Sequence, residues 1–393
     1  MTGVASYYLE FKARLRDRVS ALLGDSEREE ALRDPHSKRK PRPCGFTIHT
    51  GIGCTMGCLY CYIGDMGFPI DSIKPYPLSG VQLVYALLNN RYFLPGREGS
   101  LIALGSVTEP LHPAVLERTL EYIEAVKRYM GNHIQFSTKA YVSKTTAAKL
   151  AEIDPGISPL VTIVSLRYSS ILERNAPKPD LRFESIRTMS EAGLKPLLFL
   201  RPVIPGITEW EFEEIIDEAA EHGAIGVVAG GLRVSRGIID RLRDTGVDLR
   251  EIEKRIKIPL GKLRAGVQYG VEVSDIKEKI AAYARRKGLK YFPSACMANL
   301  YTHGETCWRM ISLGLEGQGS PLREPSKSSV EEALRDIGCS GFFKGFSEGY
   351  IIVEPDRGCD IVLAGELLRC WFKACVRFSK SRGKCLEDCG GVW

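Results

Sequence analysis

Three closely spaced cysteines carry the clearest chemical signal in the sequence. They are Cys54, Cys58 and Cys61, in the pattern C-x3-C-x2-C, and they follow a predicted strand at Phe46–Thr50. Three thiolates on one tight loop can hold three irons of a 4Fe–4S cluster. The motif supplies no fourth ligand, so the fourth iron would stay open to bind a substrate or cofactor, as open catalytic metal sites do. Half of a zinc site completed by a distant cysteine, and a purely structural cluster, are the alternatives.

Eight of the twelve cysteines lie beyond residue 290, where regular apolar periodicity is weak. Eight thiolates suffice for two four-cysteine sites, which would supply folding energy that packing alone lacks. We predict one or two auxiliary 4Fe–4S clusters there rather than a disulfide-stapled domain; zinc is less favoured, and a fraction of disulfides stays open. Cys44 has no obvious partner. The expected ligands form a dense group, Cys370, Cys375, Cys385 and Cys389, and a second group, Cys296, Cys307, Cys339 and Cys359.

The composition indicates a globular protein. The chain has 393 residues, 54 Lys+Arg against 48 Asp+Glu, a net charge of +6, and 44% hydrophobic residues. No run of 18 apolar residues occurs, and the amino terminus lacks a secretion signal, so we expect a cytoplasmic protein that does not contact membranes. Only 4 Gln and 5 Asn are present. Because these side chains are thermolabile, their scarcity is typical of a thermophile.

The elements that must position the cysteine motif form an α/β pattern. Short apolar runs alternate with amphipathic stretches such as Pro113–Tyr129, Leu181–Ala192 and Glu209–His222. This alternation predicts a parallel sheet with helical crossovers, and six units favour a partial (β/α)6 barrel. A last strand is expected at Leu289–Phe292. The six predicted strands are Phe46–Thr50, Leu101–Leu104, Ile134–Ser137, Val161–Ser165, Leu197–Val203 and Ile225–Ala229.

Three segments differ in character. Residues 1–43 contain an amphipathic helix and a basic, proline-punctuated linker, which either contacts phosphates or is a solvated spacer. Residues 44–293 form the predicted barrel. Residues 294–393 form a small Cys-rich C-terminal domain that we expect to be organised around metal.

The cysteine motif resembles that of the radical S-adenosylmethionine (SAM) superfamily. In that family three cysteines at this spacing follow the first strand of a partial barrel, with an aromatic residue before the last, here Tyr60. The resemblance implies that the open iron binds SAM, and that one electron cleaves SAM to a 5′-deoxyadenosyl radical which abstracts hydrogen from the substrate. It also implies a reducing partner such as a ferredoxin or flavodoxin.

The resemblance implies further SAM contacts at the carboxyl ends of the strands, where parallel α/β folds bind ligands. Glu109, with the glycine-rich segment before it, would face the SAM amino group, Lys139 its carboxylate, and Ser165 its ribose or carboxylate. Each alone could equally be a satisfied polar residue. The implied cofactor-binding residues are Tyr60, Gly105, Ser106, Glu109, Lys139, Ser165, Arg201, Val203 and Ile204.

Details resemble one branch, the spore photoproduct lyase and DNA-repair-photolyase-like proteins. The segments that carry this likeness are G-S-V-T-E-P at 105–110, S-T-K at 137–139 and P-V-I-P-G at 202–206, together with Glu173 and Arg182. In spore photoproduct lyase a cysteine precedes the serine after the second strand and returns hydrogen to the product radical. Gly105 stands there in this chain, which argues against photoproduct repair.

The substrate expectation is a macromolecule, with nucleic acid favoured over peptide. Lys373, Arg377 and Lys380 are interleaved with Trp371 and Phe372 near the end of the chain, a pattern suited to nucleotides. A peptide-modifying enzyme with auxiliary clusters, and a non-catalytic iron–sulfur or zinc nucleic-acid-binding protein, are the alternatives. The sequence assigns no catalytic residue for the hydrogen transfer.

Overall fold

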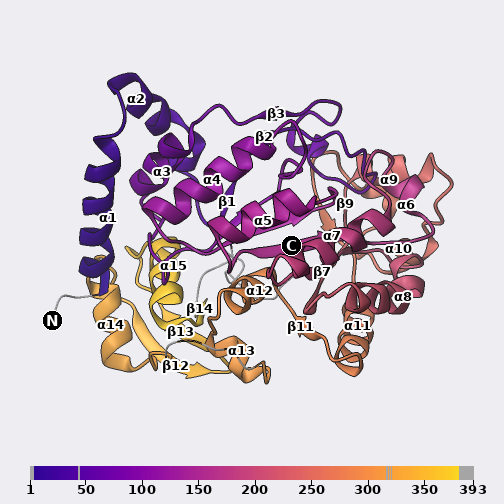
Figure 1. Cartoon of the computed structure of the whole chain (residues 1–393). Helices are drawn as coiled ribbons and strands as arrows, with labels where there is room; N and C mark the ends of the chain where they lie inside the picture. The colour runs from indigo at the N-terminus through magenta and orange to yellow at the C-terminus, as the bar shows by residue number, and fades with distance from the viewer. Residues whose placement is uncertain (1–3, 43–44, 316, 318, 320, 380–393) are drawn as a thin grey trace.

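A computed structural model describes residues 4–42, 45–315, 317, 319 and 321–379 of the chain. Its centre is a seven-stranded sheet in which every neighbouring pair is parallel. The predicted partial barrel is therefore confirmed, with the expected last strand as its seventh member (Figure 1). In spatial order the strands are β1 (Phe46–Ile48), β4 (Ile102–Leu104), β5 (Ile134–Thr138), β6 (Ser158–Thr162), β7 (Leu197–Val203), β8 (Gly226–Gly231) and β11 (Lys290–Phe292).

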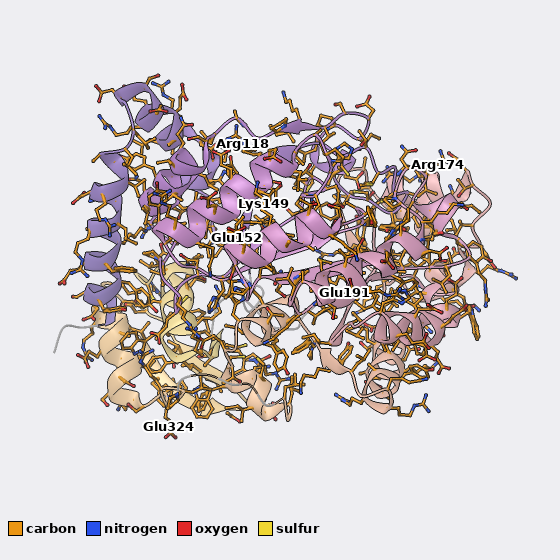
Figure 2. All side chains as sticks on the ribbon, viewed as in Figure 1. Arg118, Lys149, Glu152, Arg174, Glu191 and Glu324 are labelled. Atoms are coloured by element: carbon orange, nitrogen blue, oxygen red, sulfur yellow. A yellow bond between two sulfur atoms is a disulfide. The ribbon has the colours of Figure 1, made fainter. Side chains whose placement is uncertain are left out.

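Helices between the strands cover the sheet with their apolar faces. In α4, Leu120, Ile123 and Val126 are buried at helical spacing. The outer faces of these helices are polar: Lys149 and Glu152 of α5 are exposed and point outward (Figure 2). The covering helices are α3 (Gly80–Asn89), α4 (Leu116–Tyr129), α5 (Lys144–Ile153), α7 (Pro179–Glu191), α8 (Thr208–Glu221) and α11 (Ser274–Arg286).

Short elements decorate the carboxyl ends of the strands. A ribbon of β2 and β3 follows β1, and the pair β9 and β10 follows β8. These segments build the rim on which the cysteine motif lies. They are β2 (Gly51–Ile52), β3 (Lys74–Pro75), α6 (Ser169–Leu172), β9 (Arg233–Val234), α9 (Arg236–Arg243), α10 (Arg250–Lys254) and β10 (Tyr269–Gly270).

The amino-terminal segment packs on the barrel. Its helices α1 (Val4–Ser20) and α2 (Asp25–Arg33) both contact α3. Lys12 donates a hydrogen bond to the carbonyl of Phe93 at 2.8 Å, and Arg39 of the basic run donates to the carbonyl of Thr47 at 2.8 Å. The Arg39 side chain thus contacts the protein, so this part of the basic run is not a solvated spacer. No helix among the described residues is long and apolar enough to cross a membrane.

The C-terminal region contains a small sheet with its own apolar core. Strands β12 (Phe342–Ser347), β13 (Tyr350–Glu354) and β14 (Cys375–Phe378) are flanked by α14 (Lys327–Arg335) and α15 (Ile361–Phe372). Side chains from these elements pack together with Tyr8 of α1. The expectation that packing would contribute little here is therefore wrong, because elements distant in sequence supply the missing apolar partners.

Helices α12 (Ala295–Thr302) and α13 (Trp308–Ser312) connect the barrel to this sheet. Met297 of α12 is fully buried against Leu160 and Phe292, inside the barrel. His303, just after α12, stacks on His133, which directly precedes β5, with ring centroids 4.0 Å apart. The C-terminal region therefore closes the amino-terminal end of the barrel, opposite the cysteine motif.

Candidate active site

The cysteine motif lies on a loop that begins directly after β2. Cys54, Cys58 and Cys61 are each partly exposed, and none of them is in a disulfide. At Gly53 the backbone has φ +84°, and a Cβ atom would lie 2.3 Å from the carbonyl oxygen of Ser72. Only glycine fits this close approach, which turns the chain tightly before the first cysteine.

Backbone hydrogen bonds hold the loop in place from two sides. The amide of Leu59 donates to the carbonyl of Leu172 at 2.8 Å, and the amide of Asn175 donates to that of Met56 at 3.1 Å. From α9, the Arg241 guanidinium donates to the carbonyl of Cys61 at 2.6 Å. The spacing of the three sulfurs is thus preorganised by the fold.

The protonation state of the thiols follows from their surroundings. Burial raises the pKa of Cys58 to about 12, and burial also raises the pKa of Cys54. The ammonium of Lys139 acts in the opposite direction on both pKa values. Since iron binds thiolates, cluster assembly must displace these protons, and the nearby cation favours the charged product.

A buried ionic network lies beneath the loop. Glu173 pairs with Arg182 at 2.5 Å between Oε2 and Nη1, and the hydroxyl of Tyr60 donates to Oε1 of the same carboxylate. The Lys139 ammonium lies 4.0 Å from that oxygen and 5.6 Å from the centre of the Tyr60 ring. Tyr60, predicted as a SAM contact, therefore has its hydroxyl committed to Glu173.

The segment after β4 has buried polar atoms that a ligand could bind. Gly105 has φ +92°, and a Cβ there would lie 2.7 Å from the carbonyl oxygen of Ser137. The hydroxyl oxygens of Ser106 and Thr108 are buried and have no hydrogen-bond partner among the described residues. A buried hydroxyl without a partner is costly unless a bound molecule satisfies it. This segment fits the polar end of SAM beside the cysteine loop.

A family model for the radical SAM superfamily matches residues 48–219, which include all three motif cysteines, Glu173 and Arg182. By this match the barrel of this chain belongs to the radical SAM superfamily. It is accordingly a radical SAM enzyme, whose 4Fe–4S cluster and SAM the cysteine loop and the segment after β4 can accommodate. Cys54, Cys58 and Cys61 would hold the cluster, which when bound would supply the electron that cleaves SAM.

Sequence relatives of this radical SAM protein include two uncharacterized proteins. ORF301 of Acidianus two-tailed virus is 24% identical over 242 residues, which cover 56% of this chain and 77% of the relative. Rv2578c of Mycobacterium tuberculosis is 24% identical over 205 residues, which cover 49% of this chain and 60% of the relative.

Solved structures of similar fold include spore photoproduct lyases. A mutant lyase with bound AdoMet and dinucleoside spore photoproduct has a TM-score of 0.53 and 18% identity, covering 66% of this chain and 80% of the lyase. A lyase complexed with dinucleoside spore photoproduct has a TM-score of 0.52 at the same identity and coverage. The predicted resemblance to this branch extends to the fold.

Two predicted SAM contacts are instead engaged within the radical SAM barrel. The carboxylate of Glu109 accepts hydrogen bonds from the hydroxyl of Thr138 and from the amide of Lys139, the latter at 2.9 Å, and burial raises its pKa. The Ser165 hydroxyl is fully buried and donates to Glu211 at 2.9 Å. Glu109 thus ties the segment after β4 to the end of β5, and Ser165 ties the segment after β6 to α8, which differs from the expected direct contacts.

The end of β7 carries the remaining predicted contacts. Val203 and Ile204 are fully buried, and the amide of Ile204 donates to the hydroxyl of Thr208 at 3.0 Å. Arg201 is half-buried, and its side chain lies against Gly230, where a Cβ would come within 2.8 Å of its Cδ. The close approach of β7 and β8 thus directs Arg201 along the barrel interior.

Sequence reasoning named Arg201 and the basic run that holds Arg42, but it missed that they belong to one group of cations in this interior. Tyr62, next to Cys61, donates to the carbonyl of Ser106 at 2.9 Å, and burial raises its pKa while Arg201 and Arg42 lower it. Tyr62 also acts on the pKa of Arg233. The adjacency of Tyr62 to the motif was the available signal. We call Arg42, Arg201, Arg233 and Lys277 the barrel cations.

The predicted tail ligands separate into two places. Cys339 and Cys359 form a disulfide, so the expectation that they share a metal site with Cys296 and Cys307 is wrong, and this pair belongs to the fraction of disulfides that the sequence left open. With Asp356 their sulfurs form a group compact enough for a metal ion, should the bond be reduced. Cys385 and Cys389 lie outside the described residues. One cavity is lined by the other four, Cys296, Cys307, Cys370 and Cys375.

Proposed function

We propose that this radical SAM enzyme uses the 5′-deoxyadenosyl radical to modify a nucleic acid, RNA or DNA. The observation that carries the proposal is the concentration of positive charge in the barrel interior beside Tyr62. A substrate must lie there to be near SAM, and phosphodiesters are the anions that such cations favour.

The barrel cations come from four separate elements. Arg42 precedes β1, Arg201 is on β7, Arg233 is on β9 and Lys277 is on α11. Arg201 lowers the pKa of Lys277, next to the effect of burial, so these two charges are close enough to repel each other. Folding brings them together at a cost in repulsion, and a bound polyanion would relieve that cost.

Arg233 adds a specific feature. Its Nε atom is buried and has no hydrogen-bond partner among the described residues, although Glu272 partly balances the neighbouring Lys277. A guanidinium donates to phosphate in a planar, bidentate geometry. SAM carries a single carboxylate, and the buried Nε of Arg233 is a donor that a substrate phosphate could satisfy. The fold itself accommodates a dinucleoside lesion in spore photoproduct lyase.

The reaction proposed here is a modification rather than photoproduct repair. The cysteine that returns hydrogen in the lyase is replaced by Gly105, and its left-handed φ and contact with Ser137 leave no room for a side chain. A thiol hydrogen donor is therefore excluded at that position of this chain.

We also propose auxiliary iron–sulfur binding by the tail cysteines, and an external low-potential reductant such as a ferredoxin or flavodoxin. Iron analysis of the anaerobically reconstituted chain tests the first part. About eight irons per chain would indicate one auxiliary cluster and about twelve would indicate two, while about four with stoichiometric zinc would indicate a structural zinc site.

The substrate experiment compares macromolecules directly. Reconstituted enzyme, SAM and reductant are incubated with RNA, DNA and peptide pools, and each pool is analysed by mass spectrometry. We expect a mass change in a nucleotide. Modification of peptides alone would favour the peptide alternative, and the absence of 5′-deoxyadenosine under all conditions would favour the non-catalytic one.

A matched pair of variants tests the role of charge. Arg233→Gln removes one barrel cation and should reduce nucleic-acid modification and the salt dependence of nucleic-acid binding. Arg118→Gln removes a surface cation on α4, which pairs with Glu121 at 2.6 Å, and should leave both unchanged. Equal behaviour of the two variants would contradict the proposal.

A further inference from the structure

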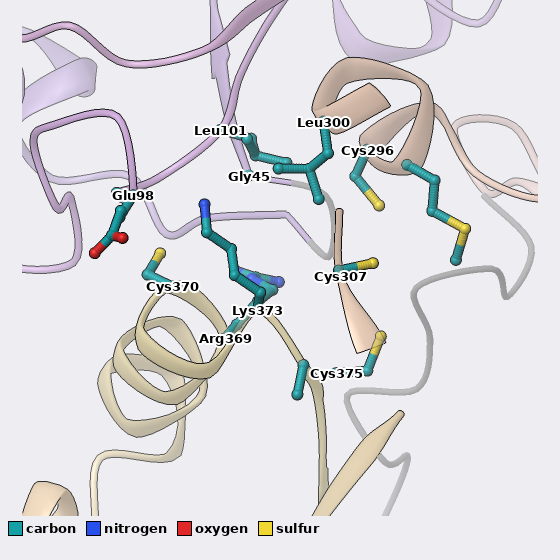
Figure 3. Close-up of a pocket in the computed structure, with 13 residues that line it drawn as sticks. Gly45, Glu98, Leu101, Cys296, Leu300, Cys307, Arg369, Cys370, Lys373 and Cys375 are labelled. Carbon is teal, nitrogen blue, oxygen red and sulfur yellow. The ribbon is translucent and has the colours of Figure 1, made fainter. Parts of the chain in front are cut away.

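Four cysteines line one cavity between the barrel and the C-terminal sheet (Figure 3). Its empty volume is about 520 Å³, including a part open to solvent. Cys296 comes from α12, Cys307 from the start of α13, Cys370 from α15 and Cys375 from β14. Four separate elements of the fold thus bring sulfur to one place.

Three of these cysteines face the same side of the cavity. Figure 3 shows the sulfurs of Cys296, Cys307 and Cys375 directed toward one region, and Cys370 on the other side, beside Glu98. The sulfur of Cys370 lies 3.9 Å from the carboxylate of Glu366. Cys296 lies close enough to Cys307 for its charge to act on the pKa of that thiol, after the larger effect of burial.

A lysine in an unusual backbone conformation supplies charge to the cavity. Lys373 has φ +51° and ends α15 in the left-handed region, which few non-glycine residues occupy. Such strained positions cluster at functional sites. Its side chain lines the cavity, with the ammonium on the side of Glu98 and Cys370 (Figure 3). A cation placed among thiols favours their anionic, metal-binding form.

We propose that this cavity binds a 4Fe–4S cluster through Cys296, Cys307 and Cys375, with Lys373 as a counter-charge. The inference locates the auxiliary cluster proposed above and is independent of the nucleic-acid proposal. Thiolates bind a single zinc with Zn–S distances of about 2.3 Å, so a zinc site closes around its ion and leaves no cavity. A four-iron cluster is larger and would fill a cavity.

Cluster binding at this site requires the reduced protein. Cys375 is in the disulfide form in this structure. A thiol reductant or the low-potential protein donor supplies two electrons and solvent supplies two protons, which converts that disulfide into two thiols. Each thiol that then binds iron releases its proton to solvent.

The position of the cavity separates it from the substrate. Gly45 and Leu101, which line it, directly precede β1 and β4, whereas the Cys54 loop follows the carboxyl end of β1. The two sites therefore lie at opposite ends of the barrel. This position suits electron supply rather than substrate binding.

The test uses the full chain with Cys54, Cys58 and Cys61 all changed to Ala, so that any iron reports the cavity alone. After reduction and anaerobic reconstitution, we expect about four irons and four sulfides per chain. Adding Cys296→Ser and Cys307→Ser should abolish iron binding. Adding Cys339→Ser and Cys359→Ser, which removes the disulfide outside the cavity, should leave the iron in place.

Several outcomes would overturn the inference. These are no iron in the Cys54/Cys58/Cys61 variant, zinc in place of iron, or full iron after loss of Cys296 and Cys307. If the chain with Cys296→Ser and Cys307→Ser fails to fold, a second variant tests the site. It carries Lys373→Met together with the Cys54, Cys58 and Cys61 changes, and the reduction potential of its cluster is measured. Removal of a cation beside a cluster should lower its reduction potential, and an unchanged potential would contradict the site. Because no substrate or SAM is used, failure here leaves the nucleic-acid proposal untouched.

Discussion

Glu173 and Arg182 form a fully buried ion pair directly beneath the cysteine loop, with 2.5 Å between Oε2 and Nη1. Neither residue exposes more than 2% of its surface. The remaining carboxylate oxygen accepts from Tyr60, and the guanidinium also donates to the carbonyls of Thr162 and Pro177. The pair thus joins α7, β6 and the segment that holds the iron-binding loop.

The first prediction concerns this pair. Glu173→Gln leaves the Arg182 charge buried without a counter-charge, and we expect a loss of about 3–5 kcal/mol in the free energy of unfolding. Urea unfolding of the apo protein measures it. The control is Glu184→Gln, which breaks an exposed pair with Arg187 and should cost less than about 1 kcal/mol. Similar losses in both variants would show that the buried pair has no special role.

The second prediction concerns the cluster that cleaves SAM. Changing Cys54, Cys58 and Cys61 together to Ala removes all three thiolate ligands, so 5′-deoxyadenosine formation under reducing conditions should fall to background. Chromatography of the reaction products measures this. Unchanged production by the variant would refute the assignment of the motif.

The third prediction separates a ligand-facing hydroxyl from a structural one. Ser106→Ala should weaken SAM binding by about 1 kcal/mol, roughly fivefold in Kd, without lowering stability, because the hydroxyl has no partner among the described residues. Ser165→Ala should instead lower stability by about 1–3 kcal/mol, because Glu211 loses a buried donor. Calorimetric SAM titration and thermal unfolding distinguish the two, and a reversed pattern would contradict the site.

Lys139 is expected to act on SAM as well as on the loop. Its ammonium lies near Glu173 and acts on the pKa of Cys58, so Lys139→Ala should weaken SAM binding by about 1.5–3 kcal/mol and also impair cluster assembly. Iron content and SAM affinity are measured on the same preparation. Equal SAM affinity at full iron content would place the SAM carboxylate elsewhere, for example on Arg201.

The final prediction concerns acid stability. Burial, followed by the charge of Arg39, lowers the pKa of His49 to about 3. The unfolded chain binds this proton near pH 6.5 whereas the folded chain stays neutral, so stability is lost as pH falls from 6.5 toward 3, by about 1.4 kcal/mol per pH unit. In His49→Gln this part of the pH dependence should vanish. The assignment would be contradicted if the free energy of unfolding of the variant depended on pH as steeply as that of the wild type.

Local patterns in the sequence were sufficient for much of the barrel. The bounds predicted for β7, Leu197–Val203, are those observed, because a buried parallel strand is rich in apolar residues, here Leu197–Leu200 and Val203. For β6 the apolar run misleads. The strand ends at Thr162, and the next three residues form a buried irregular segment, which Glu211 of α8 holds at Ser165 and Leu166. That partner is 46 residues away from Ser165, beyond the reach of any local pattern.

The cysteines show the same division. By itself the sequence determined the radical SAM motif, because three ligands within eight residues must share a loop whatever the rest of the chain does. The grouping of the tail cysteines was decided by tertiary structure alone, since the packing of α12, α13, α15 and β14 brings Cys296 and Cys307 to Cys375 and leaves Cys339 with Cys359. The barrel cations likewise come from distant elements. Short spacing restricts a site through chain geometry, whereas residues far apart in sequence meet only where the packed core places them.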